Sequence, residues 1–137
     1  MLAQICCFNN QLPQGAATSP IVSNMICAKM DAQLQQLAKR YKCTYTRYAD
    51  DITFSTTRPR FPNAIARVLE TGEVQIGDEL LSIIQSNGFE INERKVRLQT
   101  PSRSQEVTGL TTNLFPNVQR KYVREIRAML HAWEKYG

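Results

Sequence analysis

The most informative stretch of the sequence is CTYTRYADDITFS, residues 43–55. Its two halves are rich in Thr, Tyr, Ile and Phe, residue types that favour extended strands. Between the halves lie Ala49 and two adjacent carboxylates, Asp50 and Asp51. The pattern predicts a β-hairpin that carries a pair of aspartates at its turn.

Two neighbouring aspartates at a tight turn repel each other, and a bound divalent cation would offset that repulsion. Mg²⁺ prefers carboxylate oxygens and keeps coordination positions open for phosphates. Two such ions stabilise the attacking and leaving oxygens of an in-line phosphoryl displacement. An exposed turn that simply favours aspartate is the other interpretation of Asp50 and Asp51, and the pair alone leaves both interpretations open.

A long helix is predicted before the hairpin. Thr18, Ser19 and Pro20 are typical of a helix start, with a hydroxyl cap followed by a proline whose missing N–H costs nothing there. Apolar residues then fall on two faces as far as residue 39. One face carries Ile21, Met25, Ala28 and Ala32, and the other carries Ile26, Met30, Leu34 and Leu37. This distribution predicts a helix buried between layers.

Four further elements are predicted after the hairpin. An Asn-capped segment predicts a short helix over residues 63–69, and an apolar stripe predicts another over residues 76–84 that ends at an Asn-Gly pair. Residues 107–113 predict a strand, and residues 120–136 predict an amphipathic helix. The mixed order of helices and strands predicts an α+β fold.

Length and composition limit the class of protein. With 137 residues, of which 42% are hydrophobic and 21% charged, the chain is about one globular domain. No apolar run is long enough to span a membrane, and residues 1–10 lack the basic segment of a secretory signal. The four cysteines form no CxxC pair and the chain has one histidine, so a zinc site is not expected. Unpaired cysteines indicate a reducing cytoplasm.

The net charge of +5 is concentrated in the last third of the chain. Residues 1–91 contain eight basic and eight acidic residues, whereas residues 92–137 contain nine basic and four acidic ones. Basic residues fall on one arc of the C-terminal helix, namely Arg120, Arg124, Arg127 and His131. This face indicates a polyanionic partner, with a solvated helix face as the alternative.

Four motifs, read together, resemble the reverse transcriptase family. LPQGAATSPIVSN at residues 12–24 is similar to the family's motif beside the incoming nucleotide, and TRYADDITFS at residues 46–55 to its metal-binding hairpin. GFEINERKV at residues 88–96 and EVTGL at residues 106–110 resemble the following motifs, in the same order. The YADD, LPQG and VTG forms are similar to the bacterial retron-type branch. Group II intron, diversity-generating and other defence-associated enzymes are the alternatives.

The resemblance implies a fold and a domain organisation. Residues 1–117 would form part of a palm, an antiparallel sheet with the YADD hairpin packed on helices, and residues 118–137 the basic amphipathic start of a thumb. The family also needs an aspartate on an earlier strand, but the first acidic residue here is Asp31, inside the predicted helix. We therefore expect the fingers and that strand to be absent from this chain, and expect these residues alone not to polymerise DNA.

The resemblance also implies roles for individual residues. Asp50 would be the catalytic metal ligand and Asp51 a supporting one, with Mg²⁺ or Mn²⁺ as the cofactor. The implied nucleotide-binding residues are Gln14, Gly15, Tyr48, Ala49 and Lys95. The implied nucleic-acid-binding residues are Val107, Thr108, Gly109, Arg120, Lys121, Arg124 and Arg127. Structural roles are the alternatives: a turn at residues 13–15, a core tyrosine, a surface lysine, a core strand with a bulge glycine and a solvated helix face.

The function implied is that of an RNA-directed DNA polymerase in the bacterial cytoplasm, linked to phage defence, which extends a primer with dNTPs by two-metal phosphoryl transfer. Its partners would be an RNA template, a DNA or RNA primer and its own structured RNA, but no membrane. A non-catalytic nucleic-acid-binding module and a template-independent polymerase are the alternatives. Apolar surfaces left exposed by the absent parts predict self-association.

Overall fold

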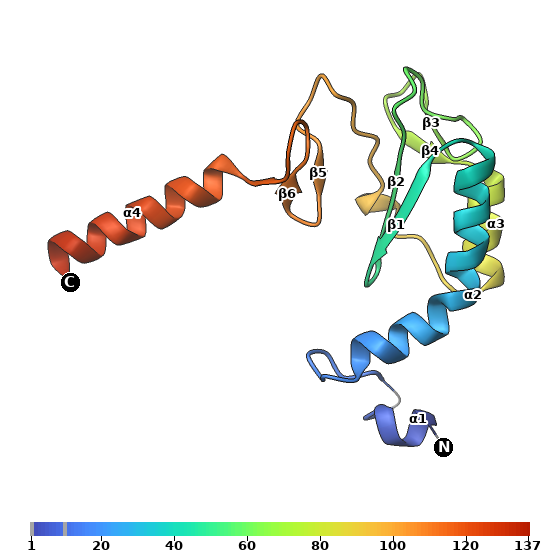
Figure 1. Ribbon diagram of the computed structural model, residues 1–137, viewed down its shortest axis with the longest axis horizontal. Coiled ribbons are helices and arrows are strands. Elements are labelled where there is room, and N and C mark those ends of the chain that lie inside the picture. Colours follow the sequence, from blue (N-terminus) through green and yellow to red (C-terminus); the bar gives the residue numbers. More distant parts are fainter. Residues whose placement is uncertain (1, 10) are drawn as a thin grey trace. The chain divides into compact units, whose positions relative to one another are not determined.

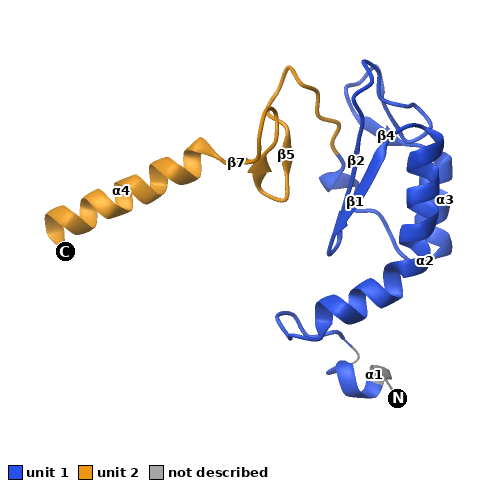
Figure 2. Ribbon diagram, viewed as in Figure 1, with its two compact units in different colours: residues 1–96 blue, residues 97–137 orange. Residues whose placement is uncertain are grey.

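In this computed structural model, which describes residues 2–9 and 11–137, the chain forms two compact units, residues 1–96 and residues 97–137 (Figure 2). The helices and small antiparallel sheets confirm the α+β prediction. The elements of the first unit are α1 (Leu2–Cys6), α2 (Ser19–Arg40), β1 (Thr44–Tyr48), β2 (Asp51–Ser55), β3 (Ala66–Val68), β4 (Val74–Ile76), α3 (Asp78–Ser86) and the 3-10 helix η1 (Glu93–Lys95). Those of the second are β5 (Glu106–Val107), β6 (Leu110–Thr111), β7 (Asn117–Val118) and α4 (Arg120–Tyr136).

The hairpin predicted from residues 43–55 is confirmed as β1 and β2 (Figure 1). The strands pair antiparallel, and Tyr48 lies opposite Asp51 at the end nearest the turn. Only Ala49 and Asp50 lie between the strands, and they form what we call the β1–β2 turn. Because side chains alternate along a strand, one face of this hairpin points into the first unit and the other points to solvent.

The buried side chains of α2 lie on one face of the helix. They are Cys27, Met30, Leu34, Leu37 and Ala38. The start of the helix was predicted to within one residue, but the prediction of a helix covered on both faces is wrong for the described residues. Ile21 and Met25 are each 64% exposed, and Ala28 and Ala32 are also exposed. The physical reason is that β1 and α3, which pack on α2, leave its other face uncovered.

Helix α3 lies alongside α2 and completes the core of the first unit (Figure 1). Leu80 and Ile84 of α3 pack into the same buried cluster as Leu34 of α2 and Ile65. The predicted end of this helix is confirmed, since Gly88 follows it with a φ of +81° and donates its N–H to the Gln85 carbonyl. Glycine adopts this left-handed conformation without steric cost.

The helix predicted over residues 63–69 is wrong, because part of this segment is strand β3, paired antiparallel with β4. The β-branched residues Val68, Val74 and Ile76 favour the extended form. Gly72, at φ +85°, closes the connection by donating its N–H to the Leu69 carbonyl. The strand pairing therefore overrides the local capping signal of Asn63.

The second unit contains a small three-stranded antiparallel sheet, β5-β6-β7, followed by α4. The single strand predicted over residues 107–113 is wrong. Thr108 and Gly109 both have positive φ, at +48° and +82°, and turn the chain back between β5 and β6. Helix α4 is confirmed with the predicted bounds, and it has no buried side chain. None of the helices in the described ranges is both long and apolar enough to cross a membrane.

Candidate functional site

The turn end of the β1–β2 hairpin carries two aspartates that are adjacent in the sequence. Asp50 occupies the second turn position and Asp51 begins β2, and both are exposed. Tyr48, opposite Asp51, is 72% exposed, and it lies on the face of β1 that alternates with the half-buried Tyr45 and Arg47. The hairpin therefore brings Tyr48, Asp50 and Asp51 together at one solvent-exposed end.

The backbone of this turn adopts an uncommon conformation. Ala49 has a φ of +52°, a region that residues with a Cβ rarely occupy. Asp50 does not share the positive φ, and two-residue hairpin turns in which only the first position has positive φ usually place glycine there. An L-residue pays about 1–2 kcal/mol for the left-handed conformation. Contacts elsewhere in the molecule must therefore stabilise the turn at Ala49.

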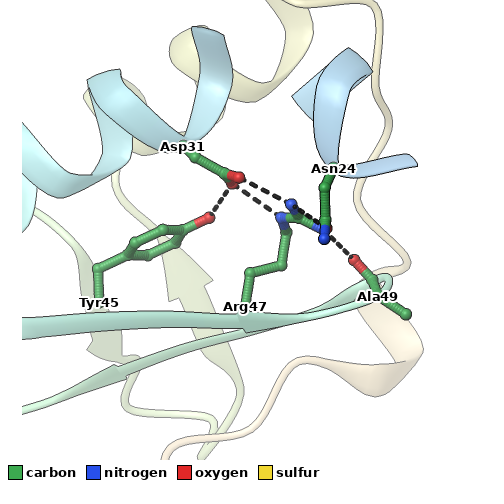
Figure 3. A network of polar contacts seen from close by, with 5 residues as sticks. All are labelled: Asn24, Asp31, Tyr45, Arg47 and Ala49. Carbon is green, nitrogen blue, oxygen red and sulfur yellow. Dashed lines mark hydrogen bonds and ion pairs between the residues drawn. The ribbon is translucent and has the colours of Figure 1, made fainter. Parts of the chain in front are cut away.

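A network around Arg47 supplies those contacts (Figure 3). Its Nε and Nη2 donate to Oδ1 and Oδ2 of Asp31 at 2.8 and 2.7 Å, and Nη2 also donates to Oδ1 of Asn24 at 3.0 Å. Its Nη1 donates to the carbonyl of Ala49 at 2.8 Å. The hydroxyl of Tyr45 donates to Asp31 Oδ1 at 2.6 Å. One guanidinium thus joins the β1–β2 turn to α2.

The network fixes the charges of its members. The Arg47 side chain is 7% exposed and that of Asp31 is 29% exposed. The hydrogen bond from Arg47 holds the pKa of Asp31 below its usual value, against the opposing effect of burial. Burial, and then the hydrogen bond to Asp31, raises the pKa of Tyr45. The hydrogen bond to Asp31 also raises the pKa of Arg47, so the pair is charged and the tyrosine neutral at pH 7.

The loop before α2 carries the predicted nucleotide-binding residues Gln14 and Gly15. Both are exposed, and Gly15 has a φ of +80°. The predicted hydroxyl cap is wrong, because Thr18 makes no side-chain capping hydrogen bond. The Ser19 hydroxyl instead donates to the carbonyl of Pro13 at 2.6 Å and so holds the loop against the first turn of α2.

The other predicted site residues take no part in the hydrogen bonds of the Arg47 network. Lys95 is exposed in η1, and no hydrogen bond or ion pair of the described residues joins it, Gln14 or Gly15 to the hairpin. In the second unit, Val107 is half-buried, whereas Thr108 and Gly109 are exposed in their turn. The predicted basic residues of α4 are all exposed: Arg120, Lys121, Arg124 and Arg127.

Sequence reasoning missed Asn24, Asp31, Tyr45 and Arg47 as parts of the site. A usable signal was present. Tyr45 and Arg47 share one face of a predicted strand, and a charged side chain on an inward face needs a partner. Asp31 is the only acidic residue before the hairpin, so it was the available counter-charge.

The chemistry of the aspartate pair suits a hard divalent cation. Mg²⁺ is commonly held by one or two carboxylates together with substrate phosphates. Asp50 and Asp51 can supply the two carboxylates. Across the described part of the chain, no group of three or more His, Cys, Asp or Glu side chains is arranged to hold a metal ion. Asp50 and Asp51 could hold such an ion through two protein ligands.

A family model and the similar proteins of known function all indicate the same family. A family model described as reverse transcriptase (RNA-dependent DNA polymerase) matches residues 3–113. The chain is 39% identical over 132 residues to the retron Ec86 reverse transcriptase of Escherichia coli, covering 96% of this chain and 38% of that protein. It is 38% identical over 130 residues to the retron Mx162 reverse transcriptase of Myxococcus xanthus, covering 90% and 27%. The chain thus spans well under half the length of these relatives. No solved structure matches it.

Proposed function

The chain belongs to the reverse transcriptase family, and from this premise we propose that it supplies the metal-binding hairpin of a retron-type RNA-directed DNA polymerase. The observation that carries the proposal is the hairpin end at which Asp50, Asp51 and Tyr48 are exposed together. The protein would extend a DNA or RNA primer with dNTPs on an RNA template. Residues 1–117 would form part of the palm and residues 118–137 the start of the thumb.

In this proposal the two aspartates are the catalytic residues that hold Mg²⁺, or Mn²⁺ in its place. The bound ion would supply charge stabilisation to the phosphoryl oxygens during displacement. Asp50, in the turn itself, would be the main ligand, and Asp51 the supporting ligand at the start of β2. Their exposure leaves room for a triphosphate to approach the same end of the hairpin.

Further residues would bind the incoming nucleotide. Tyr48 and Ala49 flank the carboxylates, and the exposed ring of Tyr48 offers a flat apolar surface for a sugar or base. Gly15 allows a ligand to approach the backbone closely, and the Gln14 amide both donates and accepts. The exposed ammonium group of Lys95 would neutralise charge on the pyrophosphate leaving group.

The second unit would contact the nucleic acid. The exposed cations of α4 follow one face of a helix and suit a phosphate backbone without reading its sequence. Val107, which is half-buried, and the exposed Thr108 and Gly109 form a hairpin end that would support the primer. The same basic face would bind the structured RNA of a retron.

Primer extension by the protein that carries this chain, together with Mn²⁺ binding to the chain, tests the proposal. We expect Asp50→Ala to lower dNTP incorporation about 100-fold or more, as loss of a group that stabilises transition-state charge does, and to remove Mn²⁺-induced broadening of the amide signals of residues 50 and 51. Glu70→Ala, which removes an exposed carboxylate from the β3–β4 connection, is the matched control and should retain both.

The alternatives would give different results in the same assays. A non-catalytic binding module would bind RNA with an affinity that does not depend on divalent ions. In that case Asp50→Ala would change neither dNTP incorporation nor the Mn²⁺-induced broadening of the amide signals, and this result would contradict the proposal. Incorporation that is independent of the template would indicate a template-independent polymerase.

The retron-type motifs also lead us to propose a link to phage defence. Phage should form fewer plaques on cells that express the protein with its retron RNA than on cells that express the Asp50→Ala variant with the same RNA. Equal plaque numbers in the two strains would contradict this part of the proposal while leaving the polymerase activity to its own assay.

A further inference from the structure

The two aspartates follow a strained turn residue whose carbonyl is bound by the side chain of Arg47 in β1. Ala49 has its φ of +52° without being glycine, and its carbonyl accepts a hydrogen bond from Nη1 of Arg47. The same guanidinium is bound to Asp31 on α2. The conformation of the β1–β2 turn is therefore coupled to the helix that forms most of the core.

We propose that Arg47 is a positioning residue for the metal-binding aspartates, because it ties the Ala49 carbonyl to Asp31 and so fixes the direction in which the β1–β2 turn presents Asp50. This inference rests on the proposed function, since it concerns how the same metal site is held. Arg47 itself does not touch the metal or the substrate.

The guanidinium group is suited to this role by its shape. Its donors form a rigid planar fork, so Nε and Nη2 bind both oxygens of Asp31 while Nη1 points to the Ala49 carbonyl. A lysine ammonium is a point charge and would keep the ion pair without holding both partners in this fixed relation. Because the Arg47 side chain is only 7% exposed, little water competes for its hydrogen bonds.

Asp31 is suited to be the anchor by its place on α2. It follows Met30, which is 3% exposed, and lies one turn before Leu34, which is fully buried. The helix is thus packed tightly on both sides of the carboxylate along the chain. The Tyr45 hydroxyl binds Asp31 Oδ1 as well, so the carboxylate is held from a second position on β1.

A merely structural role for Arg47 makes a different prediction from a positioning role. If Arg47 only stabilised the fold, its loss would lower the melting temperature but leave the metal affinity of the folded protein unchanged. If it positions the aspartates, the metal affinity of the folded protein falls. Substitution of a residue that orients metal ligands typically lowers metal affinity by about 10- to 100-fold.

The experiment compares Arg47→Lys with Arg40→Lys in the full chain. Arg40 also pairs with a carboxylate across elements, that of Glu79 on α3, and no hydrogen bond or ion pair of the described residues joins it to the hairpin, so it is a control for the same substitution at a more exposed ion pair. Mn²⁺ binding is measured by electron paramagnetic resonance below the melting temperature of each variant. We expect the dissociation constant to rise about tenfold for Arg47→Lys and to stay unchanged for Arg40→Lys.

A double-mutant cycle with Ala49→Gly tests the coupling itself. Glycine adopts a positive φ without steric cost, so the turn depends less on Arg47 once Ala49 is replaced by glycine. Arg47→Lys should then weaken Mn²⁺ binding by a smaller factor in the Ala49→Gly variant than in the protein that keeps Ala49. An equal factor in both backgrounds would contradict the proposal.

The remaining outcomes separate this inference from the proposed function. Should Arg47→Lys not fold, Asp31→Asn keeps the arginine and weakens only its anchor, and it must raise the dissociation constant in the same direction. An unchanged constant in either folded variant, while Asp50→Ala removes binding, overturns the role of Arg47 alone. If Asp50→Ala itself leaves Mn²⁺ binding intact, the proposed function fails instead.

Discussion

Arg47 and Asp31 show how a nearly buried charge is accommodated in a small fold. Burying a guanidinium is costly unless its donors are satisfied, and here Asp31, Asn24 and the Ala49 carbonyl accept from it. All buried side-chain N and O atoms of the described residues have a partner. The satisfied hydrogen bonds hold the pair in a defined geometry.

The ion pair predicts a dependence of stability on acid pH. Arg47 holds the pKa of Asp31 below the ordinary value of 3.8 in the folded state. Such a carboxyl contributes stability that is present above the unfolded pKa and is lost as the pH falls through the folded pKa. We expect the free energy of unfolding to decrease below pH 3.8, and to decrease less steeply in Asp31→Asn. Urea unfolding at a series of acid pH values measures this dependence, with Glu70→Gln as the control. If the free energy of unfolding depended on pH with the same slope in Asp31→Asn as in the unchanged protein, the prediction would be contradicted.

The aspartates could be proposed as a candidate site from the sequence, whereas the sequence indicated only that Arg47 needs a counter-charge and not the geometry of the network behind the aspartates. Asp50 and Asp51 are adjacent, so their proximity needs no knowledge of tertiary structure. The pairing of Arg47 with Asp31 depends on which face of β1 meets α2 and on which turn of α2 lies beside it. Neither register is encoded in a local pattern.

At the scale of elements, the hairpins show where local signals succeed and where they fail. β1 and β2 were predictable because two β-rich halves flank a short polar turn. β3 was mistaken for a helix because Asn63 resembles a cap, while the pairing that fixes β3 comes from β4, beyond the connection at Gly72. Strand pairing across a connection competes successfully with a local helix signal.

Gly77 is a sensitive point between β4 and α3. Its N–H donates to the Ile65 carbonyl, and a Cβ at this position would overlap the carbonyl group of Ala64. We expect Gly77→Ala to reduce the free energy of unfolding by about 1–3 kcal/mol, the usual cost of overpacking. Ser86→Ala, at the exposed end of α3, should change it by less than about 0.5 kcal/mol. Chemical denaturation measures both, and equal values would contradict the prediction.

Helix α4 predicts a salt-dependent interaction with RNA. Removing one phosphate-binding cation from a basic face lowers the slope of log affinity against log salt by about 0.7–0.9. We expect Arg124→Gln and Arg127→Gln each to weaken RNA binding and to reduce the slope by about this amount. Arg67→Gln, which removes an exposed arginine from β3, should leave the slope unchanged. Fluorescence anisotropy over a series of salt concentrations measures this slope. If all variants had the same slope as the unchanged protein, α4 would be excluded as the RNA-binding element.

At the scale of the whole molecule, each unit exposes large apolar side chains. In the first unit, Ile21, Met25 and Ile26 on α2 are each more than 60% exposed, and in the second Trp133 of α4 is 73% exposed. Exposed apolar groups of this size mark surfaces that associate with other surfaces in water. Composition alone could not show this, because it does not say which apolar residues the core uses.

These surfaces predict that the chain self-associates in solution. We expect sedimentation velocity to show species larger than a monomer as the concentration rises, and Met25→Lys to shift the distribution toward monomer. Gln35→Lys adds the same charge at another exposed position of α2 and should not shift it. A monomer at every soluble concentration would contradict the prediction.

The conformation of Ala49 has a stereochemical consequence. A φ of +52° lies in the left-handed region, which a D-amino acid favours as an L-amino acid favours the right-handed region, so D-alanine would fit the turn without the steric cost that the L-residue pays. Cys43 lies shortly before the turn and offers a junction for joining synthetic peptides. Inverting one stereocentre would keep the methyl group and every neighbouring side chain, and would change only the handedness that the backbone prefers. The configuration at residue 49 could therefore be used to control the direction in which the hairpin presents the carboxylates of Asp50 and Asp51.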